Sequence, residues 1–373
     1  MKIALVHYWF YGMRGGEKVV KEILKLYPEA DIFTHLFIPE NLDEEILKHQ
    51  VSTTFINSMP LSKKLYQAYL PLMPWALKRL DLNAYDLIIS SESGPAKGVK
   101  KNTKAKHICY CHSPMRYIWD QQSIYLEHSG VFKQAYLKSI TPFMRRWDIK
   151  SSAGVDHFIT NSSFVSKRIE GIYNRNASVI HPPVDLDQFY ISKSKGDYFI
   201  LAGQLVSYKR PDIAIQAFNE LKLPLKVIGT GDMIKYLKAI AKENIEFLGF
   251  ISDQEYQSIL SKARALIFPG VEDFGIVPVE AQAAGIPVIA LSEGGTLETV
   301  VGFNKDEKPE SDKNYSGIFF EKPTAGDLID AIRIFIDYED SFSPRFCLEN
   351  AKKFSKDKFH TEFSNFVDRV LEK

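Results

Sequence analysis

The chain has 373 residues, of which 45% are hydrophobic and 25% are charged, as is typical of soluble globular proteins. This length is too great for one ordinary core and suits two domains of roughly 150–190 residues. No apolar run approaches the roughly 20 residues that a bilayer-spanning helix needs, so we expect no transmembrane segment.

Charge is distributed unevenly along the chain. Residues 1–190 hold 24 Lys and Arg against 18 Asp and Glu, whereas the remainder holds 23 against 28, so the net charge of +1 hides a basic and an acidic half. A basic N-terminal half suggests an anionic partner there, such as a phospholipid surface or a diphosphate-bearing acceptor. Chance unevenness explains the difference equally well.

The N-terminus and the cysteines indicate the compartment. The N-terminal residues MKIALVHYWFYG hold one Lys, a brief apolar run and no small-residue cleavage site, which favours a first buried strand over a signal peptide. Cys109, Cys111 and Cys347 give no disulfide framework. Cys109 and Cys111 would share one face of a strand, but their spacing is too short for an unstrained disulfide and tighter than the usual two-thiol metal clamp. A reducing cytoplasm fits this pattern.

Both halves alternate short apolar runs with helical patterns, which predicts parallel sheets with crossover helices. The strands expected in the first half are residues 2–8, 30–37, 85–92, 106–112 and 155–162. The strands expected in the second half are residues 198–205, 225–231, 245–250, 265–270 and 287–295. The predicted fold class is therefore α/β, with two Rossmann-like, doubly wound domains facing a cleft.

The boundary between the halves falls in residues 179–197, where paired prolines precede a polar, lysine-rich stretch. We expect one domain over residues 1–190 and a second over 191–350. Residues 351–373 look helical and would return to the first domain.

Residues 62–82 mix basic residues with Leu, Tyr, Trp and Met, and Pro71 and Pro74 break them into two short helical pieces. Basic and aromatic residues beside an apolar face suit a helix lying on an anionic membrane. The basic run at residues 97–106 would add to that surface. The simpler alternative is an ordinary excursion that covers the sheet.

A glycine-rich turn and a basic turn each follow an expected strand. The sequence GMRGGEKV (12–19) opens a helix, and Gly15 and Gly16 let backbone N–H groups approach a phosphate or sugar. A plain strand-to-helix turn explains one glycine well but two adjacent glycines less well. The spacing does not match the G-x-G-x-x-G dinucleotide fingerprint. In GQLVSYKRPD (203–212), Lys209 and Arg210 suit a diphosphate or a solvated helix start.

Residues 268–285, FPGVEDFGIVPVEAQAAG, place Glu272 and Glu280 around an Asp-Phe-Gly turn that opens a helix. One carboxylate lies at the end of an expected strand, the second lies inside the helix, and free backbone N–H groups lie between them. Carboxylates accept hydrogen bonds from hydroxyls and a helix N-terminus holds anionic oxygens, so a hydroxylated ligand with a diphosphate suits this segment. The alternative is that Glu272 and Asp273 merely cap the helix.

Seven motifs occur in an order that resembles glycosyltransferase family 4, whose members are retaining nucleotide-sugar enzymes of the GT-B fold. They are GEKV, CHSPMRYIWD, HPPVDLDQF, GQLVSYKRPDIAIQAF, VIGTGD, EDFGIVPVEAQAAGIPVIA and GG. The resemblance covers almost the whole chain. The segment CYCHSPMRYIWD (109–120) is similar in particular to the mannosyltransferase branch that assembles bacterial O-antigen and related polysaccharides.

The resemblance implies roles for individual residues. It implies an acceptor-binding domain over residues 1–190 and a nucleotide-sugar-binding domain over 191–350. The implied catalytic residues are His112, whose imidazole or carbonyl would contact a hydroxyl of the transferred sugar, Lys209 on the diphosphate and Glu272 facing the donor sugar. The implied donor-binding residues are Gly15, Gly16, Arg210, Gly231, Asp273, Phe274, Gly275, Ile276 and Glu280, and the implied acceptor contacts are Arg116 and Tyr117. Where the family commonly has Arg, this chain has Gln204, so stabilisation of the leaving group would depend on Lys209, with Arg210 as a further candidate.

The implied activity is retaining transfer of a hexose, with α-mannose from GDP-mannose favoured, to a lipid-linked or soluble saccharide of a bacterial surface polysaccharide. The acceptor would be a polyprenyl-diphosphate-linked saccharide, and the enzyme would be cytoplasmic and peripheral on the inner membrane. A UDP-glucose or UDP-galactose enzyme and a non-catalytic GT-B saccharide- or partner-binding protein stay open. A dinucleotide-dependent oxidoreductase lacks its fingerprint. The Asp-Leu-Asp at 185–187 imitates a metal signature but falls in the linker, so we expect no obligatory metal, no cofactor and no nucleic-acid partner.

Overall fold

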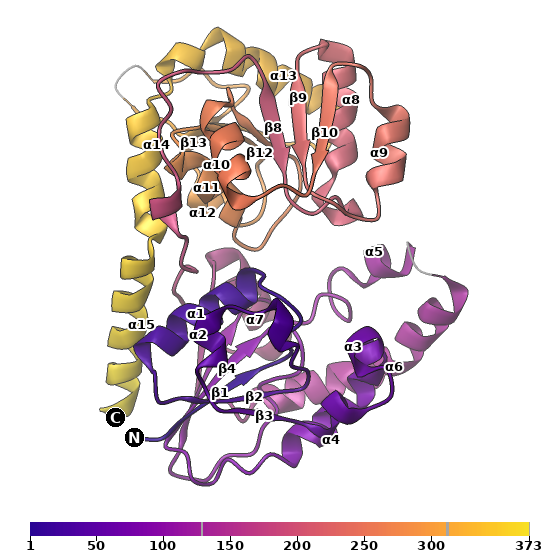
Figure 1. Cartoon of the computed structure of the whole chain (residues 1–373), viewed down its shortest axis with the longest axis vertical. Coiled ribbons are helices and arrows are strands. Elements are labelled where there is room, and N and C mark those ends of the chain that lie inside the picture. Colours follow the sequence, from indigo (N-terminus) through magenta and orange to yellow (C-terminus); the bar gives the residue numbers. More distant parts are fainter. Residues whose placement is uncertain (128–129, 311–312, 373) are drawn as a thin grey trace. The chain divides into compact units, whose positions relative to one another are not determined.

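The computed structural model describes residues 1–127, 130–310 and 313–372 and divides the chain into two compact units (Figure 1). The first unit comprises Met1–Pro183 and Lys356–Lys373, and the second comprises Val184–Ser355. The chain thus passes from one unit to the other a few residues from the boundaries expected at 190 and 350.

The first unit is built on a seven-stranded sheet in which every pair of neighbouring strands is parallel, in the order β3-β2-β1-β4-β5-β6-β7. Its strands are β1 (Ile3–His7), β2 (Asp31–Thr34), β3 (Val51–Thr53), β4 (Leu87–Glu92), β5 (Lys106–Cys111), β6 (His157–Thr160) and β7 (Ala177–Val179). All five strands predicted from apolar runs are present. The edge strands β3 and β7 were missed because each has three residues and none of them is buried.

Helices cover this sheet on both faces. They are α1 (Gly15–Leu26), α2 (Glu44–Leu47), α3 (Ser62–Leu65), α4 (Met73–Lys78), α5 (Gln122–Glu127), α6 (Val131–Ser152), α7 (Ser163–Tyr173) and α15 (Lys356–Leu371), with 3-10 turns η1 (Pro39–Asn41), η2 (Phe55–Ser58) and η3 (Tyr66–Leu72). Pro71 lies inside η3, but Pro74 lies in the first turn of α4, so the second proline begins a helix instead of breaking one.

The C-terminal helix α15 lies beside α1 in the first unit (Figure 1). Phe359, Phe363 and Phe366 recur at helical spacing, and all three are buried in the same apolar cluster as Ile23 of α1 and Leu5 of β1. This aromatic stripe explains why the end of the chain belongs to the first unit. Burial of one such side chain contributes roughly 1.5–3 kcal/mol.

The second unit repeats the architecture with strand order β10-β9-β8-β11-β12-β14-β13, again entirely parallel. Its strands are β8 (Phe199–Ala202), β9 (Leu225–Ile228), β10 (Ile245–Gly249), β11 (Leu266–Phe268), β12 (Val288–Leu291), β13 (Gly302–Asn304) and β14 (Gly317–Phe320). The five predicted strands are present here too, and the α/β fold class with two doubly wound domains is confirmed. The two strands that were missed, β13 and β14, each begin with a glycine, which weakens the strand pattern.

Both faces of the second sheet are covered by helices, which is why its strands read as unbroken apolar runs. The helices are α8 (Pro211–Leu221), α9 (Ile234–Ile240), α10 (Asp253–Lys262), α11 (Ile276–Ala283), α12 (Thr296–Thr299), α13 (Ala325–Asp337) and α14 (Pro344–Ala351), with 3-10 turns η4 (Leu186–Gln188), η5 (Ser207–Lys209), η6 (Glu339–Ser341) and η7 (Lys352–Phe354). Within the described residues, every helix is too short or too polar to span a bilayer.

Candidate functional site

A pocket in the second unit lies at the carboxyl ends of β8 and β11, which are parallel neighbours in the sheet. Its walls are residues 201–205, Lys209, Pro211, residues 268–270 and Glu272. Ligands of open α/β sheets bind at this edge, because the loops that leave neighbouring strands diverge there.

Lys209 and Glu272 meet on the wall of this pocket. The Nζ of Lys209 lies 2.5 Å from the Oε1 of Glu272, and each side chain is 22% exposed. Lys209 ends the 3-10 turn η5 after β8, and Glu272 follows β11, so the two sequence motifs converge because their strands are adjacent. A cation beside a carboxylate suits a ligand that carries both an anionic diphosphate and hydroxyl groups.

Glycines allow the backbone to pass close to this ion pair. A Cβ at Gly270 would lie 2.5 Å from the Cα of Lys209, and a Cβ at Gly231 would lie 2.2 Å from the carbonyl oxygen of Leu205. Gly231, expected as a donor contact, therefore has a packing reason to be glycine. Both positions hold the pocket walls together, since a larger residue would displace the backbone that carries Lys209 or Leu205.

The turn between Glu272 and α11 does not end in a side-chain cap for the helix. The N-cap position of α11 is Gly275, which has a φ of 90°, and no side chain accepts a hydrogen bond there. Neither Glu272 nor Asp273 occupies the N-cap, so capping does not account for the two acids. Ile276 begins the helix and is half-buried.

The pair Gly294–Gly295 supports this turn from behind. The backbone N–H of Gly295 donates to the carbonyl oxygen of Glu272 at 2.8 Å, and a Cβ at Gly295 would lie 2.3 Å from the Cα of Phe274. The ring of Phe274 is buried, with its centroid 5.4 Å from that of Phe354. The aromatic side chain of Phe274 therefore anchors the turn in the core, and only its backbone is available to a ligand.

Glu280 lies on α11 and is oriented by a tyrosine that sequence reasoning missed. The Oη of Tyr256 donates to the Oε2 of Glu280 at 2.9 Å. Burial raises the pKa of Tyr256 well above its ordinary value, and the neighbouring carboxylate adds to the effect, so this hydroxyl keeps its proton and acts as a donor. The two residues are 24 positions apart, and nothing in the sequence links them.

Arg210 follows Lys209 but is held elsewhere. Its φ of 51° lies in the left-handed region, and its Nη2 donates to the Oδ2 of Asp212 at 2.9 Å. The side chain is 42% exposed and is not among the residues that line the pocket. Gln204 does line the pocket, at the position where an arginine is common in the family that the sequence resembles.

In the first unit, Gly16 and His112 come together at the carboxyl edge of the central strands. A Cβ at Gly16 would lie 3.5 Å from the Nε2 of His112 and 2.9 Å from the Oη of Tyr8. Gly15, the first residue of α1, precedes this close approach. The expected loop and the expected histidine therefore lie side by side, and the close packing accounts for a glycine at position 16.

His112 is neutral at physiological pH and held on several sides. Its Nε2 lies 2.8 Å from the Oγ of Ser91, and the Nδ2 of Asn161 donates to its carbonyl oxygen at 3.0 Å. The pKa of His112 is lowered to about 3, mainly by burial and to a smaller extent by the nearby His7. Sequence reasoning missed Ser91, His7 and Asn161, whose only signal is a polar residue at or just beyond the end of a buried strand.

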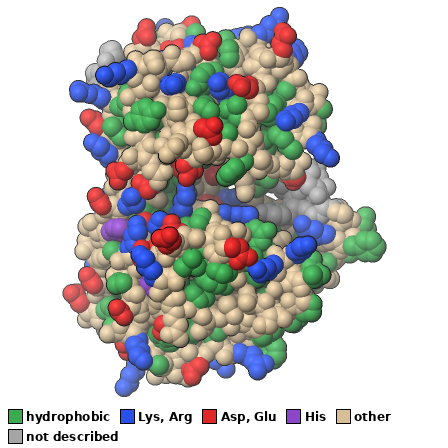
Figure 2. Space-filling view, viewed as in Figure 1, with side chains coloured by type: hydrophobic (Ala, Val, Ile, Leu, Met, Phe, Trp, Pro, Cys, Tyr) green, Lys and Arg blue, Asp and Glu red, His purple; other side chains and the backbone are tan. Residues whose placement is uncertain are grey.

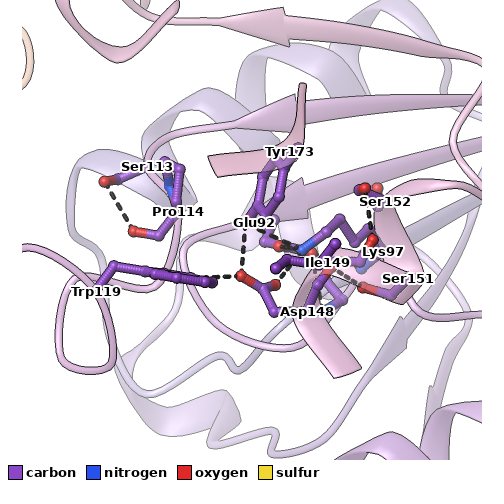
Figure 3. Close-up of polar contacts among 12 residues, drawn as sticks. Glu92, Lys97, Ser113, Pro114, Trp119, Asp148, Ile149, Ser151, Ser152 and Tyr173 are labelled. Carbon is purple, nitrogen blue, oxygen red and sulfur yellow. Dashed lines mark hydrogen bonds and ion pairs between the residues drawn. The ribbon is translucent and has the colours of Figure 1, made fainter. Parts of the chain in front are cut away.

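Arg116 and Tyr117 lie in a turn that follows β5. The backbone N–H of Gln121 donates to the carbonyl oxygen of Arg116 at 3.1 Å and closes the turn. Tyr117 packs in an apolar cluster together with Trp119. The Nε1 of Trp119 in turn donates to the Oδ2 of Asp148 at 2.8 Å (Figure 3). The turn that carries the expected acceptor residues is thus fixed to α6.

A buried charge cluster lies behind this turn (Figure 3). Lys97 is fully buried and pairs with the carboxylates of Glu92 and Asp148, while its Nζ lies 3.3 Å from the Oη of Tyr173. Burial alone would lower the pKa of Lys97, but Asp148 and Glu92 raise it above its ordinary value. The expectation that the basic run at 97–106 adds to a membrane surface is therefore wrong at Lys97, because that ammonium is enclosed in the core.

Two further expectations concern metals and cysteines. Among the described residues, no group of three or more His, Cys, Asp or Glu side chains is placed to hold a metal ion. The Oδ2 of Asp185, in the Asp-Leu-Asp sequence, accepts a hydrogen bond from Gln188 at 2.7 Å. Cys109 and Cys111 are buried free thiols in one apolar cluster, on the same face of β5.

Two family models together match nearly the whole chain. The model described as "Glycosyltransferase Family 4" matches residues 13–188, and the model described as "Glycosyl transferases group 1" matches residues 185–354. An uncharacterized glycosyltransferase of Methanocaldococcus jannaschii is 31% identical over 208 residues, which are 54% of this chain and 55% of that protein. The alpha-1,3/1,6-mannosyltransferase ALG2 of Saccharomyces cerevisiae is 24% identical over 78% of this chain and 67% of its own length.

The chain spans about half the length of the first of these relatives, and its match to ALG2 of Eremothecium gossypii covers 26% of that protein. Among solved structures, Anabaena HepE in complex with UDP and glucose has a TM-score of 0.69 at 17% identity, over 99% of both chains. The apo lipopolysaccharide outer core galactosyltransferase WaaB has a TM-score of 0.66 at 16% identity, over 99% of this chain and all of its own. At these identities the structural likeness shows the fold.

Proposed function

Because the chain belongs to glycosyltransferase family 4 and has the GT-B fold, we propose that it is a retaining hexosyltransferase that uses α-mannose from GDP-mannose. The acceptor is a lipid-linked or soluble saccharide in the synthesis of a bacterial surface polysaccharide. The observation that carries the proposal is the Lys209–Glu272 pair on the wall of the pocket at the carboxyl ends of β8 and β11.

The donor's diphosphate is bound through Lys209. On binding, the anionic oxygens attract the ammonium that now pairs with Glu272, and backbone N–H groups at residues 273–276 add hydrogen bonds. Glu272 then accepts hydrogen bonds from sugar hydroxyls. Glu280, already oriented by Tyr256, accepts from the ribose hydroxyls. The positive charge of Lys209 stabilises the departing diphosphate, so the proposal includes no obligatory metal ion.

The transfer itself is a front-face substitution. The bond from the anomeric carbon to the β-phosphate oxygen breaks, giving a short-lived oxocarbenium-like ion pair, and the acceptor oxygen forms its bond on the same face. The acceptor hydroxyl's proton passes to the departing phosphate oxygen, so atoms and charge balance. The protein's contribution is positioning and charge stabilisation, with His112 contacting a hydroxyl of the sugar.

Mannose is favoured because curated relatives are α-mannosyltransferases and because residues 109–120 are similar to a mannosyltransferase motif. A UDP-hexose donor is the second candidate, since one solved structure with this fold holds UDP and glucose.

Contact with a membrane is part of the proposal. The segment of α3, η3 and α4 exposes Trp75 (54%), and the neighbouring α6 exposes Phe132 (94%) at its start. The Oη of Tyr136 on α6 donates to the carbonyl oxygen of Ala68 in η3 at 2.7 Å, which fixes the two segments together. Figure 2 shows hydrophobic side chains where α6 begins, with Lys and Arg side chains nearby. A surface of this kind suits an anionic bilayer that presents a polyprenyl-diphosphate-linked saccharide.

The test is donor turnover with a panel of nucleotide sugars, measured with and without a bacterial membrane lipid extract and with and without EDTA. We expect release of GDP from GDP-mannose that depends on the extract and is unchanged by EDTA. Thermal stabilisation by GDP but not UDP supports the base assignment, since a ligand at about 100-fold its Kd adds about 2.7 kcal/mol. Turnover of a UDP-hexose instead selects the second candidate, and an absence of transfer from every donor contradicts the proposal.

A further inference from the structure

A series of polar contacts links His112 to a buried carboxylate in the first unit. The Nε2 of His112 lies 2.8 Å from the Oγ of Ser91, and the same Oγ lies 3.0 Å from the Nδ1 of His7. The Nε2 of His7 lies 3.7 Å from the Oε1 of Glu17. His7 and Ser91 are fully buried and Glu17 is 2% exposed, whereas His112 is half-buried.

The sheet register brings these residues together. His7 ends β1 and lies directly opposite Ser91 of β4, and His112 follows β5, the next strand of the sheet. Glu17 lies in the first turn of α1, and its Oε2 accepts from the backbone N–H of Arg14 at 3.1 Å.

The three neighbouring groups favour one arrangement of the protons. A serine hydroxyl carries one proton, so Ser91 cannot donate to both imidazoles. The Nε2 of His7 makes no hydrogen bond with any described residue, but the carboxylate of Glu17 lies 3.7 Å from it and favours a proton on that nitrogen by charge. The Nδ1 of His7 is then an acceptor for the Ser91 hydroxyl. The Oγ of Ser91 then accepts from the Nε2–H of His112. The Nδ1 of His112 consequently carries no proton.

We propose that Glu17, His7 and Ser91 are positioning residues that hold His112 in its Nε2–H tautomer, so that its Nδ1 accepts a hydrogen bond from a hydroxyl of the donor sugar. The inference rests on the proposed function, in which His112 contacts that sugar. The inference adds a donor specificity to that function. A ring nitrogen that only accepts hydrogen bonds favours a sugar with a hydroxyl at the contacted carbon over a deoxy sugar or a sugar with a carboxylate there.

The direct test is the tautomer of His112, measured by nitrogen-15 NMR of histidine-labelled protein at pH 7 without substrate. The resonance is assigned by its loss in His112→Gln. We expect an unprotonated Nδ1 and a protonated Nε2 in the wild type and in Ser91→Thr, which keeps the hydroxyl. In Ser91→Ala and in Glu17→Gln we expect a mixture of tautomers. A protonated Nδ1 in the wild type overturns the inference, and that measurement needs no variant to fold.

Kinetics supply the second readout. With the donor that the wild type turns over, Ser91→Ala should lower kcat/KM about tenfold, as loss of one hydrogen bond at a sugar does, and Ser91→Thr should restore most of it. Equal activity of Ser91→Ala and wild type contradicts the inference. The two proposals fail separately: the expected tautomer without transfer from any donor contradicts the proposed function alone, and transfer with the opposite tautomer contradicts this inference alone.

Discussion

At the level of single residues, the proposed donor site depends on the position of one cation. Lys209 and Arg210 are adjacent in the sequence and carry the same charge, but the structure separates their environments. Lys209 lines the pocket beside Glu272, whereas the guanidinium of Arg210 binds Asp212 and is 42% exposed. The backbone explains the separation, because Lys209 ends η5 and Arg210 turns away in the left-handed region.

Replacing each of these cations tests the assignment of the diphosphate. Lys209→Ala should weaken binding of GDP, measured by calorimetry, about tenfold to a hundredfold, which is the effect of losing a hydrogen bond between charged groups. Arg210→Ala serves as the matched control and should change the Kd by less than about threefold, since an exposed ion pair with Asp212 contributes little. Equal losses in the two variants would show that Lys209 is not the diphosphate ligand.

The site residues that the sequence predicts lie in local motifs, whereas the site residues that it misses are brought together only by the sheet. Lys209 and Glu272 each belong to a motif with its own local pattern, and two adjacent strands bring them within 2.5 Å. Ser91 and His7, in contrast, contact each other across 84 positions, and neither lies in a recognisable motif. Such contacts depend on strand order and register, which a single sequence does not specify.

At the level of elements, the turn from Glu272 to Ile276 depends on glycines that lie elsewhere in the sequence. Gly295 donates to the carbonyl oxygen of Glu272, and its lack of a side chain lets α12 begin against Phe274. The apolar runs predicted the strands that flank this turn. The sequence offered the diglycine only as the last of the motifs that resemble family 4, and the structure shows that it packs against the backbone of the Glu272 turn.

Gly295→Ala should therefore displace the turn without unfolding the unit. A Cβ there would lie 2.3 Å from the Cα of Phe274, a clash with backbone that costs about 1–3 kcal/mol and shifts Glu272. We expect the Kd for GDP to rise roughly tenfold or more. Gly326→Ala is the matched control, because nothing lies within 4 Å of the added Cβ. If both variants bind GDP as the wild type does, the turn takes no part in donor binding.

The exposed side chains on α4 and α6 predict binding to an anionic surface. The wild type should sediment with phosphatidylglycerol vesicles. A Trp75→Asp, Phe132→Asp double variant should bind these vesicles with an affinity at least roughly fivefold lower, because it replaces apolar contacts with charge repulsion. Tyr236→Asp, at a side chain 49% exposed on the second unit, is the control. Equal binding by the control and the double variant would refute this surface as the site of membrane contact.

At the scale of the whole molecule, the chain forms two units with separate cores, and each sheet is covered on both faces. The sequence predicted ten of the strands and the α/β class because both sheets are buried and their central strands are continuous apolar runs. It did not predict the short edge strands β3 and β7, which have no buried residue, or the glycine-led strands β13 and β14. It suggested the return of the C-terminal helix, whose buried phenylalanines on the first sheet became visible only in the structure.

The first unit should lose stability as the pH falls from 7 to 5. Burial lowers the pKa of His35 to about 3, of His107 to about 4 and of His112 to about 3, against an unfolded value of 6.5. At a pH between the folded and the unfolded pKa, the unfolded chain binds more protons than the folded chain. Each histidine therefore lowers the free energy of unfolding by about 2 kcal/mol when the pH falls from 7 to 5. Urea unfolding of the first unit at both pH values measures the loss.

A single variant isolates the contribution of one histidine. Burial raises the pKa of Glu92, which acts in the opposite direction, so the comparison of wild type with His35→Asn is more direct than the wild-type curve alone. We expect the difference in unfolding free energy between pH 7 and pH 5 to shrink by about 2 kcal/mol in His35→Asn. An unchanged difference would mean that His35 titrates alike in the folded and unfolded chains.

The most direct test of the whole account is the turnover of Glu272→Gln with GDP-mannose, or with whichever donor the panel identifies. The variant keeps the shape of the side chain but removes the charge that faces Lys209, so we predict a fall in kcat of roughly a hundredfold or more with an unchanged melting temperature. Glu246→Gln, at an exposed glutamate on β10, should turn over at the wild-type rate. Near-wild-type turnover by Glu272→Gln would contradict the claim that this pocket carries out the transfer.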